Sequence, residues 1–387
     1  PLNPSYKLKE YEFYLQDLMP KIVIVEKDSQ NPVVEAAKNL GIEICEIKKI
    51  DNAPAGIFNL YEETSNFELA TENNEALVLH TSGTTSRPKV VPLTNKNIFS
   101  SATNISNSLQ LSSHDNCYNI MPLFHIHGLI AVLSSSINAG ASVYASSGFN
   151  ALKFLETADK ESITWYSGVP TMHQAILMRA KKNPKLAEEL NLRFIRSSSA
   201  SLPPAVFDEL KKIFKTTVIE AYGMTEATHQ MTSNPMPPEK QKAGFVGKPA
   251  GPEVCIMDAQ GNKLDSGVDG EVCIRGDNVT NGYENNKEAN KTAFINGWFR
   301  TGDQGHFDDE GYLKISGRLK EIINRGGEKV SPLEVDNTLM EHKAVEQVVT
   351  FAVKDNLLGE AIGVAIVLKS GIDCNETDIK NYARKYL

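Results

Sequence analysis

A nine-residue segment, Thr81–Lys89, gathers side chains that suit the binding of phosphate. Its sequence, TSGTTSRPK, holds five hydroxyl groups, a glycine and a terminal lysine. Hydroxyls and exposed backbone N–H groups donate hydrogen bonds to phosphate oxygens, and a lysine adds a positive point charge. The segment is not the Walker pattern GxxxxGK[ST], which does not occur in this chain. Composition alone would favour a Ser/Thr-rich surface loop.

The elements around this segment favour phosphate binding. Ala76–Leu79 (ALVL) predicts a short buried strand before it. After it, Thr94 predicts the N-cap of a helix with apolar residues at helical spacing. Those residues are Ile98, Ala102, Ile105 and Leu109. Ligands of open α/β sheets bind beyond the carboxyl ends of parallel strands, where such a segment would lie.

Alternating strand and helix patterns predict an α/β fold built on parallel-rich sheets. Lys21–Glu26 (KIVIVE) and Ile42–Ile47 predict strands, and Pro32–Leu40 predicts the helix between them. The alternation repeats, with strands expected at 142–145 and 163–166 and helices through Leu155 and Met178. We therefore expect a large N-terminal domain whose sheets are layered with helices.

The pattern changes near residue 244 and again near residue 320. Short strand patterns separated by Gly/Asp turns predict a β-rich subdomain over about 244–319. These patterns lie at 253–257, 270–275 and 311–315. A helix after Pro332 and strands at 345–353 and 361–368 predict a small α+β module. We predict one domain over 1–319 and the start of a small C-terminal domain over 320–387.

Composition narrows the class of protein. The chain has 387 residues, of which 41% are hydrophobic and 23% charged, which fits two or three globular domains and not a disordered, collagenous or coiled-coil chain. The net charge of −8 disfavours nucleic acid as a partner, so an anionic ligand needs a local site. Five cysteines without CxxC spacing predict reduced thiols in a cytosolic-type compartment. No apolar run is long enough for an integral membrane segment.

Five motifs in order along the chain resemble those of the adenylate-forming (AMP-binding) enzymes, which include acyl-CoA synthetases, peptide-synthetase adenylation domains and luciferases. Besides TSGTTSRPK they are MPLFH at 121–125, AYGMTE at 221–226, GWFRTGD at 297–303 and GRLKE at 317–321. Three further segments resemble the oxalate–CoA ligase branch. They are TEATHQMTSN at 225–234, RGDNVTNGY at 275–283 and NRGGEKVSP at 324–332.

Family members extend beyond both ends of this sequence. The chain opens at Pro1 without a methionine, and we expect a piece of a longer protein. The family's C-terminal segment carries a catalytic lysine, and Lys385 lacks the surrounding pattern, so that role is not transferred to it.

The resemblance implies a two-step reaction: ATP adenylates a carboxylic acid, and coenzyme A then displaces AMP. A divalent cation, Mg²⁺, and preorganised donors would stabilise the phosphate charge. By resemblance, the β- and γ-phosphates are bound by Thr81, Ser82, Gly83, Thr84, Thr85, Ser86 and Lys89. Thr225 would contact the α-phosphate and, with Glu226, help hold magnesium. Without the family match, Thr225 and Glu226 would be a helix-capping pair.

The remaining implied roles concern the nucleotide, the hinge and coenzyme A. Tyr222 would stack on adenine, with Ser199 and Ala200 near the base, and Asp303 would accept hydrogen bonds from the ribose. Arg318 would contact the nucleotide, Lys320 would be the hinge of the small domain, and Gly326 and Gly327 would approach the pantetheine arm. Without the family match, Tyr222 would be a core aromatic and Asp303 a turn aspartate. Lys320 would be a solvated lysine at a helix end, and the two glycines would form a turn.

The same resemblance favours oxalate as the acid. Oxalate keeps one carboxylate after the other is adenylated, and burying that anion requires hydrogen-bond donors. We predict that His125, Ser198, Ser199 and His229 supply them, with a histidine protonated near neutral pH where it faces the anion. His125 and His127 form an HxH pair, but no histidine or cysteine at metal-binding spacing joins them, which disfavours zinc.

Other readings remain open at this stage. Within the family, the acid could be an aromatic or short-chain monocarboxylate. A non-catalytic nucleotide-binding module would follow if the native chain ended at Leu387. A serine hydrolase lacks its GxSxG elbow, and a dinucleotide oxidoreductase lacks its GxGxxG turn. A cytoplasmic location is expected, with a peroxisomal address open, and the sequence does not predict an oligomeric state.

Overall fold

Alternating valines build the sheet at the start of the chain. Strand β1 (Ile22–Glu26) buries Val23 and Val25 and exposes the residues between them. It pairs in parallel with β2 (Glu43–Lys49), which pairs antiparallel with β3 (Phe58–Leu60). Helices α1 (Leu8–Leu18) and α2 (Val33–Asn39) contribute the other apolar residues of this core. The predicted β–α–β alternation is confirmed.

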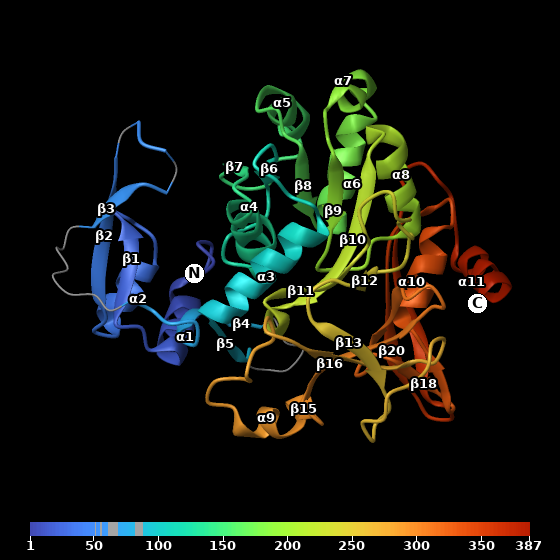
Figure 1. Ribbon diagram of the computed structural model, residues 1–387. Helices are drawn as coiled ribbons and strands as arrows, with labels where there is room; N and C mark the ends of the chain where they lie inside the picture. Colours follow the sequence, from blue (N-terminus) through green and yellow to red (C-terminus); the bar gives the residue numbers. More distant parts are fainter. Residues whose placement is uncertain (51, 55, 61–68, 82–87) are drawn as a thin grey trace. The chain divides into compact units, whose positions relative to one another are not determined.

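The computed structural model describes residues 1–50, 52–54, 56–60, 69–81 and 88–387 (Figure 1). Contacts divide the chain into two units, Pro1–Thr71 and Glu72–Leu387. The valine-based sheet forms the first unit, and the predicted site residues lie in the second.

Short buried strands form the central sheet of the second unit. The strand order is β12-β11-β10-β9-β8-β6-β7. The strands are β6 (Asn116–Asn119), β7 (Ser142–Ala145), β8 (Trp165–Gly168), β9 (Phe194–Ser197), β10 (Thr217–Met224), β11 (His229–Ser233) and β12 (Lys248–Pro249). Strands β7, β6, β8, β9 and β10 run parallel, and β11 and β12 continue the sheet antiparallel. Every residue of β8 and β9 is buried, as expected of parallel strands covered on both faces.

Helices supply apolar residues to two cores of this unit. One core contains Ile105 and Leu109 with Trp165 of β8, and the other contains Ile176 and Leu210 with residues of β8 and β9. The helices are α3 (Asn95–Ser108), α4 (Ser135–Asn138), α5 (Phe154–Lys160), α6 (Pro170–Ala180), α7 (Pro184–Glu189) and α8 (Pro204–Phe214), with a π-helix at His127–Ser134 and a 3₁₀ turn at Thr225–Ala227. Figure 1 shows α6 and α8 beside strands β8–β10. This is the layered α/β arrangement that the sequence predicted.

The strand before the segment Thr81–Lys89 has an antiparallel partner that its sequence pattern did not predict. Strand β4 (Glu75–His80) pairs with β5 (Val90–Thr94) in a two-stranded ladder. Thr81 N–H donates to Lys89 O at 2.9 Å and Lys89 N–H to Thr81 Oγ1 at 3.2 Å, which extends the ladder by one residue pair. The segment thus joins two antiparallel strands, and its expected place at the end of a parallel strand is wrong. Residues 82–87 lie outside the described part of the chain.

The predicted helix after this hairpin is confirmed. It begins at Asn95, and Thr94 is its N-cap, whose hydroxyl accepts a hydrogen bond from Asn97 N–H at 3.2 Å. The side chain of Asn97 in turn accepts from the Thr94 N–H, which completes a capping box.

Antiparallel strands form the β-rich part. Its strands are β13 (Glu253–Met257), β14 (Gly270–Arg275), β15 (Phe294–Ile295), β16 (Trp298–Phe307) and β17 (Leu313–Arg318), with α9 (Lys287–Ala293) before β15. Next comes a four-stranded sheet with two helices, as predicted for the α+β module. It contains β18 (Ile323–Arg325), β19 (Glu328–Val330), α10 (Pro332–Met340), β20 (Val345–Asp355), β21 (Gly359–Leu368) and α11 (Glu376–Tyr386).

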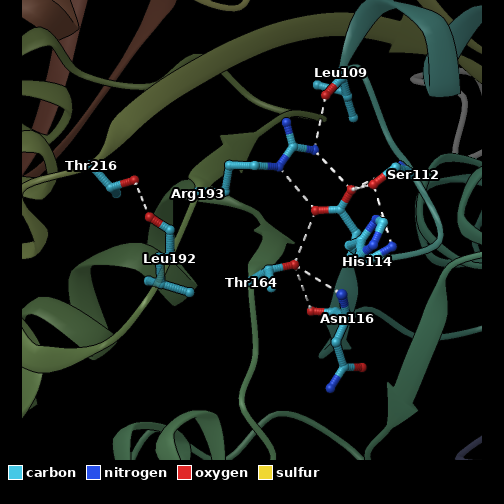
Figure 2. Close-up of polar contacts among 9 residues, drawn as sticks. Leu109, Ser112, His114, Asn116, Thr164, Leu192, Arg193 and Thr216 are labelled. Atoms are coloured by element: carbon cyan, nitrogen blue, oxygen red, sulfur yellow. Dashed lines mark hydrogen bonds and ion pairs between the residues drawn. The ribbon is translucent and has the colours of Figure 1, made fainter.

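An ion pair fixes the amino ends of three parallel strands (Figure 2). Asp115, Thr164 and Arg193 each stand one residue before a strand, β6, β8 and β9 respectively. The Arg193 guanidinium donates to both Asp115 carboxylate oxygens, from Nε at 2.9 Å and Nη2 at 3.1 Å. The Thr164 hydroxyl donates to Asp115 Oδ1 at 3.1 Å. Because each of these strands is four residues long, this network also sets where their carboxyl ends lie.

Removing the arginine should destabilise the fold. Arg193→Met leaves the Asp115 carboxylate, which is 4% exposed, without a cation, and we expect the free energy of unfolding to fall by about 3 kcal/mol. Urea denaturation measures this change. Lys185→Met is the control: it breaks a solvent-exposed pair with Glu189 and should cost less than about 1 kcal/mol. Equal stability of the two variants would contradict the structural role of Arg193.

Candidate active site

A cavity of about 650 Å³ in the second unit brings together nine predicted site residues. They are Thr81, Lys89, His125, Ser199, Thr225, Glu226, His229, Arg318 and Lys320. This volume lies within the usual range of small-molecule sites. Residues distant in sequence, from the connection between β4 and β5, the π-helix, the end of β10 and the end of β17, thus face one space.

Six predicted residues do not line this cavity: Ser198, Ala200, Tyr222, Asp303, Gly326 and Gly327. Ser198 is buried and its hydroxyl donates to Ala221 O at 2.9 Å, while Ala200 is exposed in the loop before α8. Gly326 and Gly327 form the exposed turn between β18 and β19 with φ of 63° and 99°, which favours glycine. The predicted residues Ser82–Ser86 lie outside the described part of the chain.

Tyr222 and Asp303 are bonded to each other in this structure. The Tyr222 hydroxyl donates to the Asp303 carboxylate, and Arg318 Nε forms an ion pair with the other carboxylate oxygen at 2.8 Å. Burial raises the pKa of Asp303, against the opposing effect of Arg318. The aspartate expected to accept from a ribose therefore already has two partners, of which Arg318 is the more exposed.

An unusual backbone directs His229 into the cavity. Thr228 and His229 have φ of 48° and 93°, a left-handed region that non-glycine residues rarely adopt. Gly223 makes this possible, because a Cβ there would lie 1.8 Å from the His229 carbonyl oxygen. The buried Asn278 amide holds the segment by donating to Ala227 O at 2.8 Å and Gln230 O at 3.1 Å. Such stored strain is typical of functional sites.

A fully buried arginine next to the cavity was missed by the sequence analysis. Arg196 is 0% exposed, forms no ion pair among the described residues, and has no partner for its Nε atom. Its Nη1 lies 3.4 Å from His127 Nε2 and 3.3 Å from Ser167 Oγ, and its Nη2 donates to Gln230 Oε1 at 3.1 Å. The only available signal was an arginine inside an apolar strand pattern, FIRS. The structure thus holds a positive charge that only neutral groups contact.

The histidines around this charge are neutral. Burial first, and then Arg196, hold the pKa values of His127 and His229 well below the ordinary value, and burial lowers that of His125. Arg196 therefore supplies the positive charge at this end of the cavity. The protonation of a histidine that faces a bound anion stays a prediction.

Glu226 is one of three acidic residues that line the cavity; of the others, Glu271 pairs with Arg300 and Glu321 is exposed. Glu226 is 6% exposed, and its Oε1 accepts a hydrogen bond from the Tyr283 hydroxyl at 2.8 Å. Across the residues that the structure describes, no group of three or more His, Cys, Asp or Glu side chains could form a metal cage. A single carboxylate fits a cation that is held mainly by substrate phosphates and water, as Mg²⁺ commonly is.

Comparison with known proteins places this geometry in a family. The model for AMP-binding enzymes matches residues 1–284, and the model for the AMP-binding enzyme C-terminal domain matches residues 334–387. The oxalate–CoA ligase of Arabidopsis thaliana is 47% identical over 100% of this chain and 77% of that protein. The oxalate–CoA ligase of Saccharomyces cerevisiae is 42% identical over 100% and 76%. The ATP-bound crystal structure of MatB from Rhodopseudomonas palustris superimposes with a TM-score of 0.89 at 27% identity, covering 100% of this chain and 76% of MatB.

The chain belongs to the family of AMP-binding enzymes. The predicted adenylate-forming fold and the predicted class, an ATP-dependent acid–CoA ligase, are confirmed. Among the described residues, no helix has the length and apolar character that crossing a membrane requires.

The buried histidines make stability depend on pH. Burial lowers the pKa of His173 to about 4, so between that value and 6.5 the unfolded chain binds more protons at this site than the folded chain. At pH 5 His173 should thus cost roughly 2 kcal/mol of folding free energy relative to pH 7.5. Glu220 acts in the opposite direction, because burial raises its pKa to about 8.

Variants separate these contributions. His173→Gln should lose about 2 kcal/mol of the pH-dependent change in unfolding free energy, whereas His114→Gln, at an exposed position, should keep the wild-type profile. Urea denaturation at several pH values between 5 and 7.5 gives both profiles. Identical profiles for the two variants would show that His173 is not held neutral by burial.

Proposed function

We propose that this acid–CoA ligase acts on oxalate. The observation that carries the proposal is the buried Arg196 charge beside the cavity, which neutral side chains alone contact. A buried cation without a counter-ion is costly, and a bound anion would offset that cost. Oxalate supplies one, because its second carboxylate stays ionised when the first is adenylated.

A chain of hydrogen bonds would transmit this charge to the ligand. Arginine only donates, so the Ser167 hydroxyl accepts from Arg196 and can donate to His127 Nε2, at 2.7 Å. This leaves the His127 proton on Nδ1, which donates to Ser199 Oγ at 2.9 Å. The Ser199 hydroxyl hydrogen is then available to an anion in the cavity.

His229 adds a second donor. It is 1% exposed, and both of its ring nitrogens lack partners, although buried polar atoms are normally paired. Its ring centroid lies 5.0 Å from that of His127, so both rings border the same end of the cavity. A small carboxylate held between them would satisfy His229, whereas a fatty acyl chain would leave these groups unpaired.

The nucleotide and its cation would bind at the other side of the cavity. Lys89 and Thr81 would contact the outer phosphates with residues 82–86, Thr225 would contact the α-phosphate, and Glu226 would contribute to binding Mg²⁺, which neutralises phosphate charge when bound. Tyr222 and Asp303 would serve the adenosine once Arg318 turns toward the phosphates. Gly326 and Gly327 would border the pantetheine arm of coenzyme A.

The reaction then follows from these positions. An oxalate carboxylate oxygen attacks the α-phosphorus of ATP, and pyrophosphate leaves. The coenzyme A thiol, as thiolate, attacks the carbonyl of oxalyl-AMP, and AMP leaves with the electrons of the broken acyl–phosphate bond. The groups at His127, His229 and Ser199 hold the remote carboxylate throughout, so that the reacting carboxylate faces the phosphates.

Acid specificity tests the proposal. Pyrophosphate release by the full-length protein should favour oxalate over acetate by on the order of 10⁴-fold in kcat/KM, because acetate leaves buried donors unpaired. Malonate and a medium-chain fatty acid complete the panel. His229→Ala should reduce kcat/KM for oxalate roughly 10–150-fold with little change in ATP binding, and the exposed His114→Ala should behave as wild type. A preference for a monocarboxylate, or full oxalate turnover by His229→Ala, would refute the oxalate assignment, and the lack of any turnover would favour a binding module.

The proposed hinge provides a separate test. Lys320 is exposed at the cavity edge, within a turn held by three backbone hydrogen bonds. Leu319 N–H donates to Gly302 O, and the N–H groups of Glu321 and Ile322 donate to Arg318 O. Lys320→Pro keeps all three donors and restricts φ at residue 320. If the small domain turns there between the two steps, thioester formation and adenylate formation should be slowed unequally. Single-turnover assays of each step measure this, and equal effects would exclude Lys320 as the hinge.

A further inference from the structure

Tyr283 contacts two oppositely charged residues of the cavity at once. Its hydroxyl donates to Glu226 Oε1 at 2.8 Å, and the Lys89 ammonium lies 4.3 Å from the centroid of its ring. Tyr283 is itself 8% exposed and lines the cavity. Tyr283 is the last residue of the RGDNVTNGY segment, for which the sequence predicted no role in the site.

The position of Tyr283 is fixed by the loop between β14 and α9. Its backbone N–H donates to Asn290 Oδ1 and its carbonyl accepts from Asn290 Nδ2, both at 2.8 Å. The next residue, Glu284, donates its N–H to Val90 O of β5 at 2.9 Å. Val90 directly follows Lys89, so this bond ties the loop to the lysine. On the other side, Thr280 N–H of the same loop donates to the Glu226 carbonyl at 2.8 Å. Tyr283 therefore keeps one position relative to both charged residues.

We propose that Tyr283 is a positioning residue that holds Lys89 and Glu226 apart, so that each charge stays available to its own part of the magnesium–nucleotide complex. The inference rests on the proposed function, in which Lys89 binds phosphate and Glu226 serves the cation. Lys89 and Glu226 form no ion pair within the described part of the chain, although both line the same cavity.

Physical chemistry explains why a tyrosine suits this position. Opposite charges in a partly dry cavity attract much more strongly than in water and would pair directly if nothing lay between them. The negative face of the ring attracts the ammonium group, and the hydroxyl bonds the carboxylate. The phenol O–H of tyrosine is the donor in this hydrogen bond, and the carboxylate accepts. One side chain thus gives each charge a separate partner.

ATP binding by the full-length protein, without acid or coenzyme A, tests the inference independently of turnover. Calorimetry would be done in EDTA and across a range of Mg²⁺ concentrations. Tyr283→Phe keeps the ring and loses the hydroxyl, so ATP affinity in EDTA should stay within about threefold of wild type. The Mg²⁺ concentration that gives half of the maximal increase in ATP affinity should rise roughly tenfold or more, because Glu226 loses the hydrogen bond that positions it.

Tyr283→Leu removes the ring and should let Lys89 pair with Glu226. ATP affinity in EDTA should then fall about tenfold or more, and adding Glu226→Gln to this variant should restore part of it, because Lys89 loses its new partner. A purely structural role would not predict this rescue. Tyr312 offers the matched control, since its hydroxyl bonds Lys240 O at 2.6 Å and Lys242 lies 4.5 Å from its ring centroid, outside the cavity. Tyr312→Phe and Tyr312→Leu should leave ATP and Mg²⁺ dependence unchanged.

Two further variants distinguish a failure of this inference from a failure of the proposed nucleotide and magnesium site. If Lys89→Met and Glu226→Gln alone leave ATP and Mg²⁺ binding at wild-type values, the proposed nucleotide site itself is wrong. If they weaken binding while both Tyr283 variants match the Tyr312 controls, or if Glu226→Gln gives Tyr283→Leu no rescue, the role of Tyr283 is overturned.

Discussion

The ion pair between Asp115 and Arg193 sets the geometry on which the cavity depends. The ion pair joins the residues that directly precede strands β6 and β9. The Thr164 hydroxyl, directly before β8, donates to the same carboxylate. Strands of four residues leave no room for slippage, since a shift by one residue would move every side chain to the other face. In the resulting register Ser167 of β8 lies opposite Arg196 of β9. The contact between Ser167 and Arg196, near the carboxyl ends of β8 and β9, therefore depends on the ion pair at the amino ends of the strands.

Arg196 is stable inside the protein because neutral acceptors surround it. Ser167, His127 and Gln230 contact its guanidinium, and Gln230 is held in turn by its own amide donations to Ser108 Oγ and Ala250 O, each at 2.9 Å. Burial lowers the pKa of Arg196 to about 9, which still leaves it charged at neutral pH. Burial first, and then this charge, lower the pKa values of the neighbouring His127 and His229. Arg196 thus reinforces the neutral state that burial already favours for these two histidines.

Sequence patterns predicted the regular elements well where burial dictates residue type. The strands at 142–145, 253–257 and 270–275 were placed at their observed bounds, and Thr94 was identified as an N-cap. Strand β5 was missed because Pro92 interrupts its apolar pattern, and a two-stranded ladder leaves half of its backbone groups free for such a residue. The parallel topology expected around Thr81–Lys89 was wrong because β4 pairs antiparallel with this unpredicted strand.

Only the site residues that belong to sequence motifs could be predicted. Motif matches identified Lys89, Thr225, Glu226 and His229, which all line the cavity. No motif describes a contact between residues far apart in the sequence. Arg196 and Tyr283 contribute through such contacts, across 69 and 57 residues to His127 and Glu226. A charged residue in a buried strand pattern was the one local sign, and it becomes informative only when its surroundings are known.

The buried arginine also limits how the substrate range of such an enzyme can evolve. Replacing Arg196 alone with an apolar residue would remove the hydrogen-bond donor of the Gln230 carbonyl and the Ser167 hydroxyl. Replacing either neighbour alone would remove an acceptor from the buried guanidinium. Each single substitution therefore lowers the stability of the fold. A change at this position therefore requires coupled substitutions of Arg196 and the side chains that contact it.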